Sequence, residues 1–201
     1  DGLQILINLT HRGATGADAC TGDGAGILVQ MPDAMLRERT AVRGLRLPDP
    51  GDYAAGLVFL PPDVDQRQAC MDAIERIVGA EGLDFLGWRT VPVNPDVLGE
   101  IARRAMPAIR QMFVGRPASV AAGADFERKI FVVRKVIERW VRESGLPERV
   151  YFYIPSLSSR IMVYKGLLLA DQIPRFFGDL EDETMVSSFA QIGRASCRER
   201  V

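Results

Sequence analysis

The chain has 201 residues, of which 47% are hydrophobic and 25% charged, so its composition is that of a globular protein with a substantial core. Its net charge of -1 favours neither nucleic acid nor an anionic membrane surface, and no apolar run or leader pattern indicates a membrane span or a signal peptide. The three widely spaced cysteines do not form a disulfide framework. We therefore expect a cytoplasmic protein without nucleic-acid or membrane partners.

The opening residues, DGLQILINLTHRG, predict the last turns of a helix that ends at Gly13, and they include no initiator methionine. The final stretch 193–201, GRASCRERV, has three arginines, a cysteine and no apolar period. It resembles translated adapter sequence, and we expect it to be a non-native tail. On this interpretation, residues 1–192 are an internal part of a longer domain.

The first half of the chain alternates between strand and helix patterns. A short apolar run at 24–31 predicts a buried strand, and 32–44 predicts a helix that ends at Gly44. The dipeptides of PDPG predict a turn at 48–51. Further along, we expect a strand at 53–60, a helix at 63–82, a strand at 83–93 and a helical turn at 95–107. The helix at 63–82 would place Val64, Met71, Ile74 and Val78 on one buried face and end at Gly79 or Gly82.

The second half contains the clearest helix pattern. A strand at 108–116 is followed by a helix at 125–145, with an apolar stripe and three charge pairs spaced four residues apart. The stripe is formed by Phe126, Ile130, Val133, Ile137 and Trp140, and the pairs are Asp125–Lys129, Arg134–Glu138 and Glu138–Arg142. After it we expect strands at 149–157 and 159–168, a short helix at 170–182 broken at Pro174, and a last strand at 185–192. The two adjacent strands without a helix between them argue against a doubly wound nucleotide-binding fold.

The stretch HRGATGADACTGDGAGILVQ, residues 11–30, carries the densest group of polar and small residues. A phosphate-binding loop needs glycines after a strand and before a helix, and here the order is helix, glycines, strand. A calcium loop would need a later glutamate, but position 29 is Val, and the single histidine excludes a histidine-rich metal site. We therefore expect no metal site, with Asp18 and Asp23 accepting backbone hydrogen bonds in a tight turn.

Two other sites are also disfavoured. Cys20 and His11 could approach each other, but a nucleophilic pair requires a third, orienting group that the sequence does not indicate. The arginines and lysines of 125–145 alternate with acidic residues rather than with aromatic ones, which is typical of a solvated helix face and not of a nucleic-acid interface.

Two segments near opposite ends of the chain resemble one known family. HRGATGADACTGDGAGILVQMP and SLSSRIMVYKGLLLADQIPRFFGDL are similar to blocks of the N-terminal glutaminase domain of glutamate synthase large subunits, a class II glutamine amidotransferase. The resemblance implies an α+β fold of the N-terminal-nucleophile hydrolase type, an αββα sandwich that is incomplete here. The residues that match the family motifs, and to which we assign structural roles, are His11, Arg12, Gly13, Asp18, Gly22, Asp23, Gly24, Gly26, Ser159, Arg160, Tyr164, Lys165 and Gly166.

The resemblance also implies a reaction whose catalytic groups have no match here. In the family an N-terminal cysteine attacks the carboxamide of glutamine, its α-amine acts as base, an Asn side chain and a Gly N–H form the oxyanion hole, and an Arg binds the substrate carboxylate. Position 1 is Asp, Cys20 occupies a variable position, and Arg194 does not lie in the family's arginine motif. We therefore expect no catalytic residue in this chain and no glutaminase activity from it alone.

For the parent enzyme, the resemblance implies conversion of glutamine and 2-oxoglutarate to glutamate. It also implies a synthase domain on the same polypeptide, flavin mononucleotide and an iron–sulfur cluster in other domains, and ferredoxin or another subunit as electron donor. We expect no cofactor in these residues. Two alternatives stay open from the sequence: a non-catalytic interaction domain with the same scaffold, and an amidotransferase domain that serves another ammonia acceptor.

Overall fold

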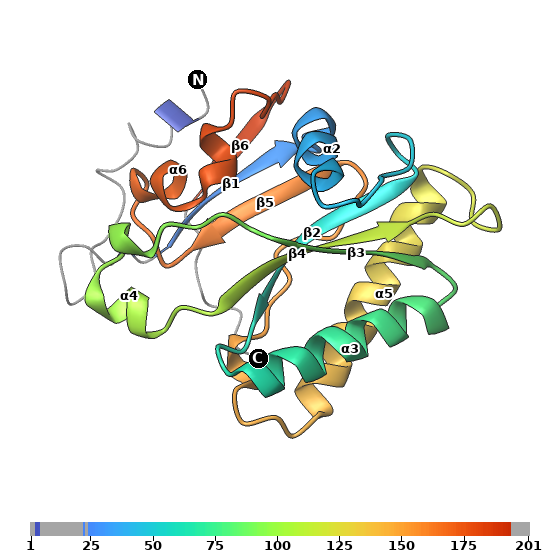
Figure 1. Ribbon diagram of the computed structural model, residues 1–201, viewed down its shortest axis with the longest axis horizontal. Helices are drawn as coiled ribbons and strands as arrows, with labels where there is room; N and C mark the ends of the chain where they lie inside the picture. Colours follow the sequence, from blue (N-terminus) through green and yellow to red (C-terminus); the bar gives the residue numbers. More distant parts are fainter. Residues whose placement is uncertain (1–2, 5–21, 23, 194–201) are drawn as a thin grey trace. The chain divides into compact units, whose positions relative to one another are not determined.

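A computed structural model describes residues 3–4, 22 and 24–193, and these fall into two compact units (Figure 1). The first unit draws on the ranges 1–35, 91–106 and 163–201, and the second on 36–90 and 107–162. Each unit has its own three-stranded sheet. The predicted helix end at Gly13 lies outside the described residues, and of the predicted tail only Gly193 is described.

The sheet of the second unit has the order β2-β4-β3, with β2 at Tyr53–Leu60, β4 at Ala108–Gly115 and β3 at Asp84–Thr90. Both pairings are antiparallel. All eight residues of β2 are buried, which explains its continuous apolar sequence. The strands predicted at 53–60 and 108–116 are thus confirmed, whereas the one predicted at 83–93 ends three residues early.

Two long helices, α3 (Val64–Ala80) and α5 (Ala124–Glu143), pack against this sheet and against each other. Figure 1 shows them side by side on one face of the three strands. The side chains between helices and sheet form the core of the second unit, in which Met112 of β4 and Ile130 of α5 are fully buried. At roughly 1.5–3 kcal/mol for each fully buried large apolar side chain, this face is a major source of stability.

The predicted apolar face of α3 is partly wrong. Ile74 and Val78 are buried, but Val64, the first residue of the helix, is 65% exposed. Val64 lies only about 40° around the helix from the buried Val78 at 100° per residue, so its direction does not explain its exposure. It is exposed because it lies in the first turn, whereas the buried residues of α3 begin at Cys70. The helix continues through Gly79 and ends before Gly82, whose φ of 74° is the left-handed conformation that glycine adopts readily.

The predicted stripe of α5 is confirmed for Phe126, Ile130, Val133 and Ile137, all fully buried. Trp140 is only half-buried, and Val141 completes the stripe instead. Of the predicted charge pairs, Arg134–Glu138 forms at 2.7 Å. The other two are wrong, because nearer partners compete: Asp125 pairs with Arg128, Lys129 with Glu81 at the C-cap of α3, and Glu138 with Lys135.

The strand predicted at 149–157 is also wrong. Residues Arg149–Tyr151 form a 3₁₀ turn (η3), and the backbone after it pairs with β2 only through isolated bridges, Phe59 with Tyr153 and Ala55 with Ser158. Between the two bridges β2 advances by four residues, from Ala55 to Phe59, whereas the partner segment advances by five, from Tyr153 to Ser158. A regular ladder cannot stay in register across this mismatch. Pro155 lies between the two bridges and has no N–H to donate to a ladder.

The sheet of the first unit has the order β5-β1-β6, with β1 at Ala25–Gln30, β5 at Ile161–Gly166 and β6 at Ala190–Gly193. β1 and β6 pair antiparallel, with Gly26 opposite Gly193. The strand predicted at 24–31 is confirmed, and the strand predicted at 159–168 forms over its central part. Because the register pairs that the structure gives are antiparallel in both units, the prediction against a parallel doubly wound sheet is confirmed as well.

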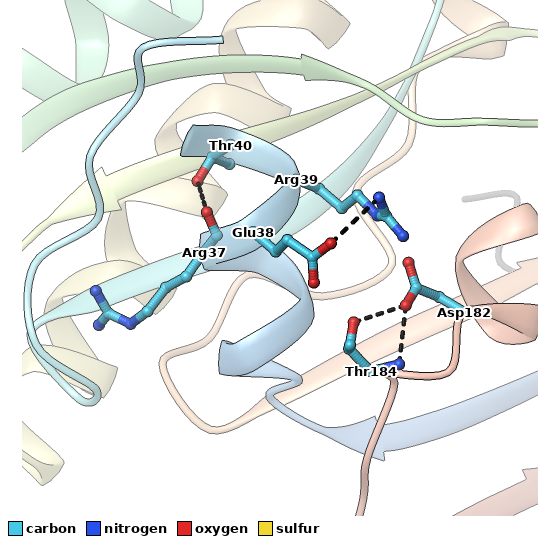
Figure 2. Close-up of polar contacts among 6 residues, drawn as sticks. All are labelled: Arg37, Glu38, Arg39, Thr40, Asp182 and Thr184. Carbon is cyan, nitrogen blue, oxygen red and sulfur yellow. Dashed lines mark hydrogen bonds and ion pairs between the residues drawn. The ribbon is translucent and has the colours of Figure 1, made fainter. Parts of the chain in front are cut away.

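The last predicted strand, 185–192, is correct only for its final residues. Before β6, the chain turns at Asp182, whose carboxylate accepts hydrogen bonds from the N–H and the hydroxyl of Thr184 at 2.9 and 2.6 Å (Figure 2). Ser187 then accepts a hydrogen bond from the N–H of Gln30 through its side chain, in place of a backbone ladder. Local side-chain bonds of this kind compete with strand pairing.

Short helices connect these elements. α2 (Asp33–Ala41) confirms the helix predicted at 32–44; its later turns carry an ion pair between Glu38 and Arg39 and a bond from the Thr40 hydroxyl to the Arg37 carbonyl (Figure 2). The predicted helical turn at 95–107 appears as η2 (Pro95–Val97) and α4 (Glu100–Arg104).

The break predicted at Pro174 is wrong, because α6 (Gln172–Phe176) includes this proline. It lies in the first turn, where a backbone N–H has no helical partner to lose. A 3₁₀ turn, η4 (Gly178–Glu181), follows. Among the helices that the structure describes, none is long and apolar enough to cross a membrane.

Candidate functional site

Gly22 and Gly26, which together with Gly24 form the glycine segment, lie against β5 and the residues just after it, within the second family-like block of the sequence. A Cβ atom added at Gly22 would fall 2.4 Å from the carbonyl oxygen of Leu168, and one added at Gly26 would fall 2.8 Å from the Cβ of Lys165. A real Cβ atom essentially never lies this close to a non-bonded atom, so this approach of the two chain segments requires glycine at both positions. Two blocks more than 130 positions apart in the sequence therefore meet in one sheet.

Gly24 has a different reason to be glycine. Its φ is 129°, in a region that L side chains rarely adopt. Glycine is thus required at Gly24 by the backbone conformation, and at Gly22 and Gly26 by the lack of space for a side chain. The other predicted residues of this block, His11, Arg12, Gly13, Asp18 and Asp23, lie outside the described residues, as does Cys20.

Tyr164 fixes β5, the strand that Gly26 contacts, in the core of the first unit. Its ring is fully buried, stands edge-on to Phe177 at 5.2 Å between ring centres, and its hydroxyl donates to the Asp179 carboxylate at 3.1 Å. Lys165 and Gly166, which follow it, are half-buried. Sequence reasoning did not single out Asp179, although an acid directly after an aromatic pair and a glycine was a weak signal for a buried hydrogen-bond acceptor.

A second polar anchor holds the residues just before β5, Ser159 and Arg160. The Glu127 carboxylate of α5 accepts hydrogen bonds from three donors, the hydroxyl of Ser158 at 3.0 Å and the N–H and hydroxyl of Ser159 at 2.7 and 2.6 Å. The Ser158 oxygen in turn accepts from the N–H of Arg160 at 3.0 Å, while the Arg160 side chain is exposed. Glu127 belongs to the acidic residues that the sequence assigned to the solvated helix face; instead it fixes the loop before β5.

The middle of the second unit's sheet holds a buried polar row that the sequence did not reveal. Arg89 and Gln111 are directly opposite each other on β3 and β4, and both are almost completely buried. The guanidinium donates to the Gln111 side-chain oxygen at 2.6 Å, and the Gln111 amide donates to the sulfur of Met162 at 3.4 Å. Hydrogen bonding of this kind offsets the cost of burying a charged group.

The reactive groups of the described residues are few. Cys70 of α3 is fully buried, and burial raises the pKa of its thiol to about 11, so it is protonated at neutral pH and a poor nucleophile. The single histidine lies outside the described residues. Within residues 3–4, 22 and 24–193, no group of three or more His, Cys, Asp or Glu side chains could hold a metal ion. What the described residues of the first unit provide is β5, anchored through Tyr164, beside Gly22 and Gly26.

Comparison with known proteins identifies the family. The sequence profile of class II glutamine amidotransferases matches residues 1–195. The chain belongs to this family. It is 43% identical over 95% of its length to the glutamate synthase [NADPH] large chain of Bacillus subtilis, and 40% identical over 94% to that of Azospirillum brasilense. The chloroplastic ferredoxin-dependent glutamate synthase of Oryza sativa is 37% identical over 94% of the chain.

Membership confirms the predicted resemblance and the predicted fold class, a mixed α+β fold of the N-terminal-nucleophile hydrolase type. The chain spans about 12% of the length of these three relatives. The two blocks of the sequence analysis therefore correctly indicated the family, and the structure shows that they are adjacent in space.

Proposed function

We propose that this chain supplies scaffold of the glutaminase domain of a glutamate synthase. The observation that carries the proposal is the match to glutamate synthases of bacteria and plants along nearly the whole chain, at 43% identity for the Bacillus subtilis protein. In the parent, ammonia released from glutamine would pass to a synthase domain of the same polypeptide. That domain would combine it with 2-oxoglutarate to give glutamate.

In this proposal the chemistry requires groups that these residues do not match. A cysteine thiol at the N-terminus of the mature parent would attack the glutamine carboxamide, with its own α-amine as base, and ammonia would leave before water hydrolyses the glutamyl thioester. An Asn side chain and a Gly N–H would stabilise the oxyanion, and an Arg would bind the substrate carboxylate. We propose that residues 1–192 hold none of these groups and do not hydrolyse glutamine alone.

The proposed role of these residues is to position the groups that the parent adds. β6 pairs with β1 so that Gly193 lies opposite Gly26, beside the glycine segment. In the resembled family the arginine motif directly follows the SFAQI stretch, which here ends within β6. The motif would therefore leave this sheet next to the glycine segment, and that placement supports a role for the segment in shaping the substrate site.

The remaining cofactors and partners of the parent belong to the same proposal. Flavin mononucleotide and an iron–sulfur cluster would be bound by other domains. The relatives' names differ in the electron donor, with NADPH, NADH and ferredoxin all represented. We infer that this domain does not determine the donor. The cytoplasmic setting stays a prediction.

The test compares four proteins: the 201-residue chain, the chain with an N-terminal extension that begins with cysteine, the chain extended through the arginine and Asn-Gly motifs, and the chain with both extensions. Each is incubated with glutamine, and ammonia is measured. Catalytic groups that act as a unit are strongly non-additive, so only the doubly extended protein should release ammonia above a buffer control. Comparable turnover without the N-terminal extension would contradict the proposal, and no turnover from the doubly extended protein would favour a non-catalytic interaction domain.

A further inference from the structure

Two buried polar side chains of the first unit hold β5 and the residues just after it. Asp179, in η4, is almost completely buried and accepts a hydrogen bond from the hydroxyl of Tyr164 in β5 at 3.1 Å. Gln172, the first residue of α6, is also buried; its side-chain oxygen accepts from the N–H of Leu169 and its amide donates to the carbonyl of Val97, both at 2.8 Å. The segment of α6 and η4 therefore bonds to β5 at one point and to the residues after it at another.

The glycine segment meets the chain next to these two points. A Cβ atom at Gly26 would clash with Lys165, the residue after Tyr164, and one at Gly22 would clash with the backbone of Leu168. Such close packing leaves no slack, because a movement of β5 in one direction produces overlap and a movement in the other opens a gap. The two buried bonds therefore help to determine where the glycine segment lies.

Aromatic packing alone would keep Tyr164 in the core. Its ring stands edge-on to Phe177, which in turn stands edge-on to Phe176 at 4.8 Å between ring centres. The hydrophobic effect has no direction, whereas a hydrogen bond fixes the distance and angle between donor and acceptor. Burial of the Asp179 carboxylate also costs free energy, so this bond favours a defined position of β5 over stability alone.

We propose that Asp179 and Gln172 are positioning residues of the glutamine site. This inference rests on the proposed function, in which the arginine motif continues from β6. By holding β5, the two side chains fix the glycine segment, and the ladder between β1 and β6 transmits this position to Gly193, opposite Gly26. They act on the substrate arginine through the sheet and touch no reacting atom themselves.

The test measures glutamine hydrolysis by the doubly extended protein and its variants. Asp179→Ala and Gln172→Ala should each raise the KM for glutamine about tenfold, because a displaced arginine binds the substrate carboxylate less well. The kcat should stay unchanged, since the arginine contributes to substrate and transition-state binding alike. Loss of folding would do the opposite, because it lowers the amount of active protein, and with it the apparent kcat, at constant KM.

Two conservative variants keep the test decisive if an alanine variant does not fold. Tyr164→Phe removes the hydroxyl that Asp179 accepts and keeps the packed ring, so it should raise the KM in the same direction as Asp179→Ala. Asp179→Asn keeps an oxygen that accepts from this hydroxyl, so its KM should stay within about threefold of the original.

Asp52→Ala is the matched control for stability. It breaks the ion pair of Asp52 with Arg116 at 2.6 Å in the second unit, so it should lower the Tm without changing the KM. Equal KM values in Asp179→Ala, Gln172→Ala, Tyr164→Phe and the original would overturn this inference and leave the proposed function intact. No hydrolysis by the original doubly extended protein would contradict the proposed function itself, and this inference with it.

Discussion

The helix-covered sheet of the second unit and the glycine segment of the first unit are held together in different ways. In the second unit, large side chains such as Ile130 and Met112 fill the space between helices and sheet. In the first, Gly22 and Gly26 bring one backbone directly against another, with no side chain between them. Side-chain packing tolerates some change of shape, whereas a backbone contact allows no added atom, so the glycine positions are the more restrictive ones.

The largest expected effect comes from the side-chain core. Ile130→Ala should lower the free energy of unfolding by about 2–5 kcal/mol, because it leaves a cavity in a fully buried site. Urea denaturation measures it. Phe131→Ala, one position along the same helix but 56% exposed, is the control and should change stability by less than about 0.5 kcal/mol. Similar losses in both variants would show that α5 does not pack as described.

The backbone contact should be sensitive to a single methyl group. Gly26→Ala places a Cβ 2.8 Å from that of Lys165 and should destabilise the chain by about 1–3 kcal/mol. Gly193→Ala makes the same change opposite Gly26 in the ladder, where a Cβ would meet no atom within 4 Å. Equal urea midpoints for the two variants would show that the close contact at Gly26 does not restrict this position.

The anchor before β5 should have an intermediate effect. Glu127→Ala leaves the Ser158 and Ser159 donors without their acceptor, at a cost of about 1–3 kcal/mol. Glu143→Ala on the same helix removes only an exposed pair with Arg139 and should be close to neutral. Hydrogen exchange of the Ser159 amide should also speed up in Glu127→Ala alone; unchanged protection there would contradict the anchoring role.

The smallest expected effect concerns Glu138 and depends on pH. Burial raises the pKa of this carboxyl, but hydrogen bonds from Lys135 and Arg134 and their charges more than offset it, so the pKa is lowered overall. A lowered pKa gives stability that is present above the unfolded-state pKa and is lost as the pH falls through the folded-state pKa. Glu138→Gln should therefore cost about 0.5 kcal/mol at neutral pH, and this difference should vanish in acid. A difference that stays constant with pH would mean that the charge is irrelevant.

Sequence patterns predicted the elements whose side chains have a clear period. The stripe of α5 and the continuous apolar run of β2 follow from helix and buried-strand periodicity, and both are confirmed. The segment 149–157 has the composition of a strand, yet Pro155 and a one-residue mismatch with β2 prevent a ladder. Periodicity does not reveal such mismatches, because they depend on the partner strand.

The site was predictable only in part for a similar reason. Its two blocks were recognised as family motifs, but their contact through Gly22 and Gly26 depends on how distant strands pair. Glu127 was assigned to a solvated face because its neighbours along the helix are charged, and Arg89 gave no signal within its strand. Both are fixed by partners far away in the sequence.

The claim that these residues provide scaffold and not catalytic groups has a direct test. The doubly extended protein is treated with a glutamine analogue that carries an electrophilic diazoketone, and the modified residue is located by peptide mass spectrometry. We predict a single label on the N-terminal cysteine of the extension, prevented by excess glutamine, with Cys20 and Cys70 unmodified. A glutamine-protected label on Cys20, Cys70 or any other residue within 1–192 would place the nucleophile inside this chain and contradict the account.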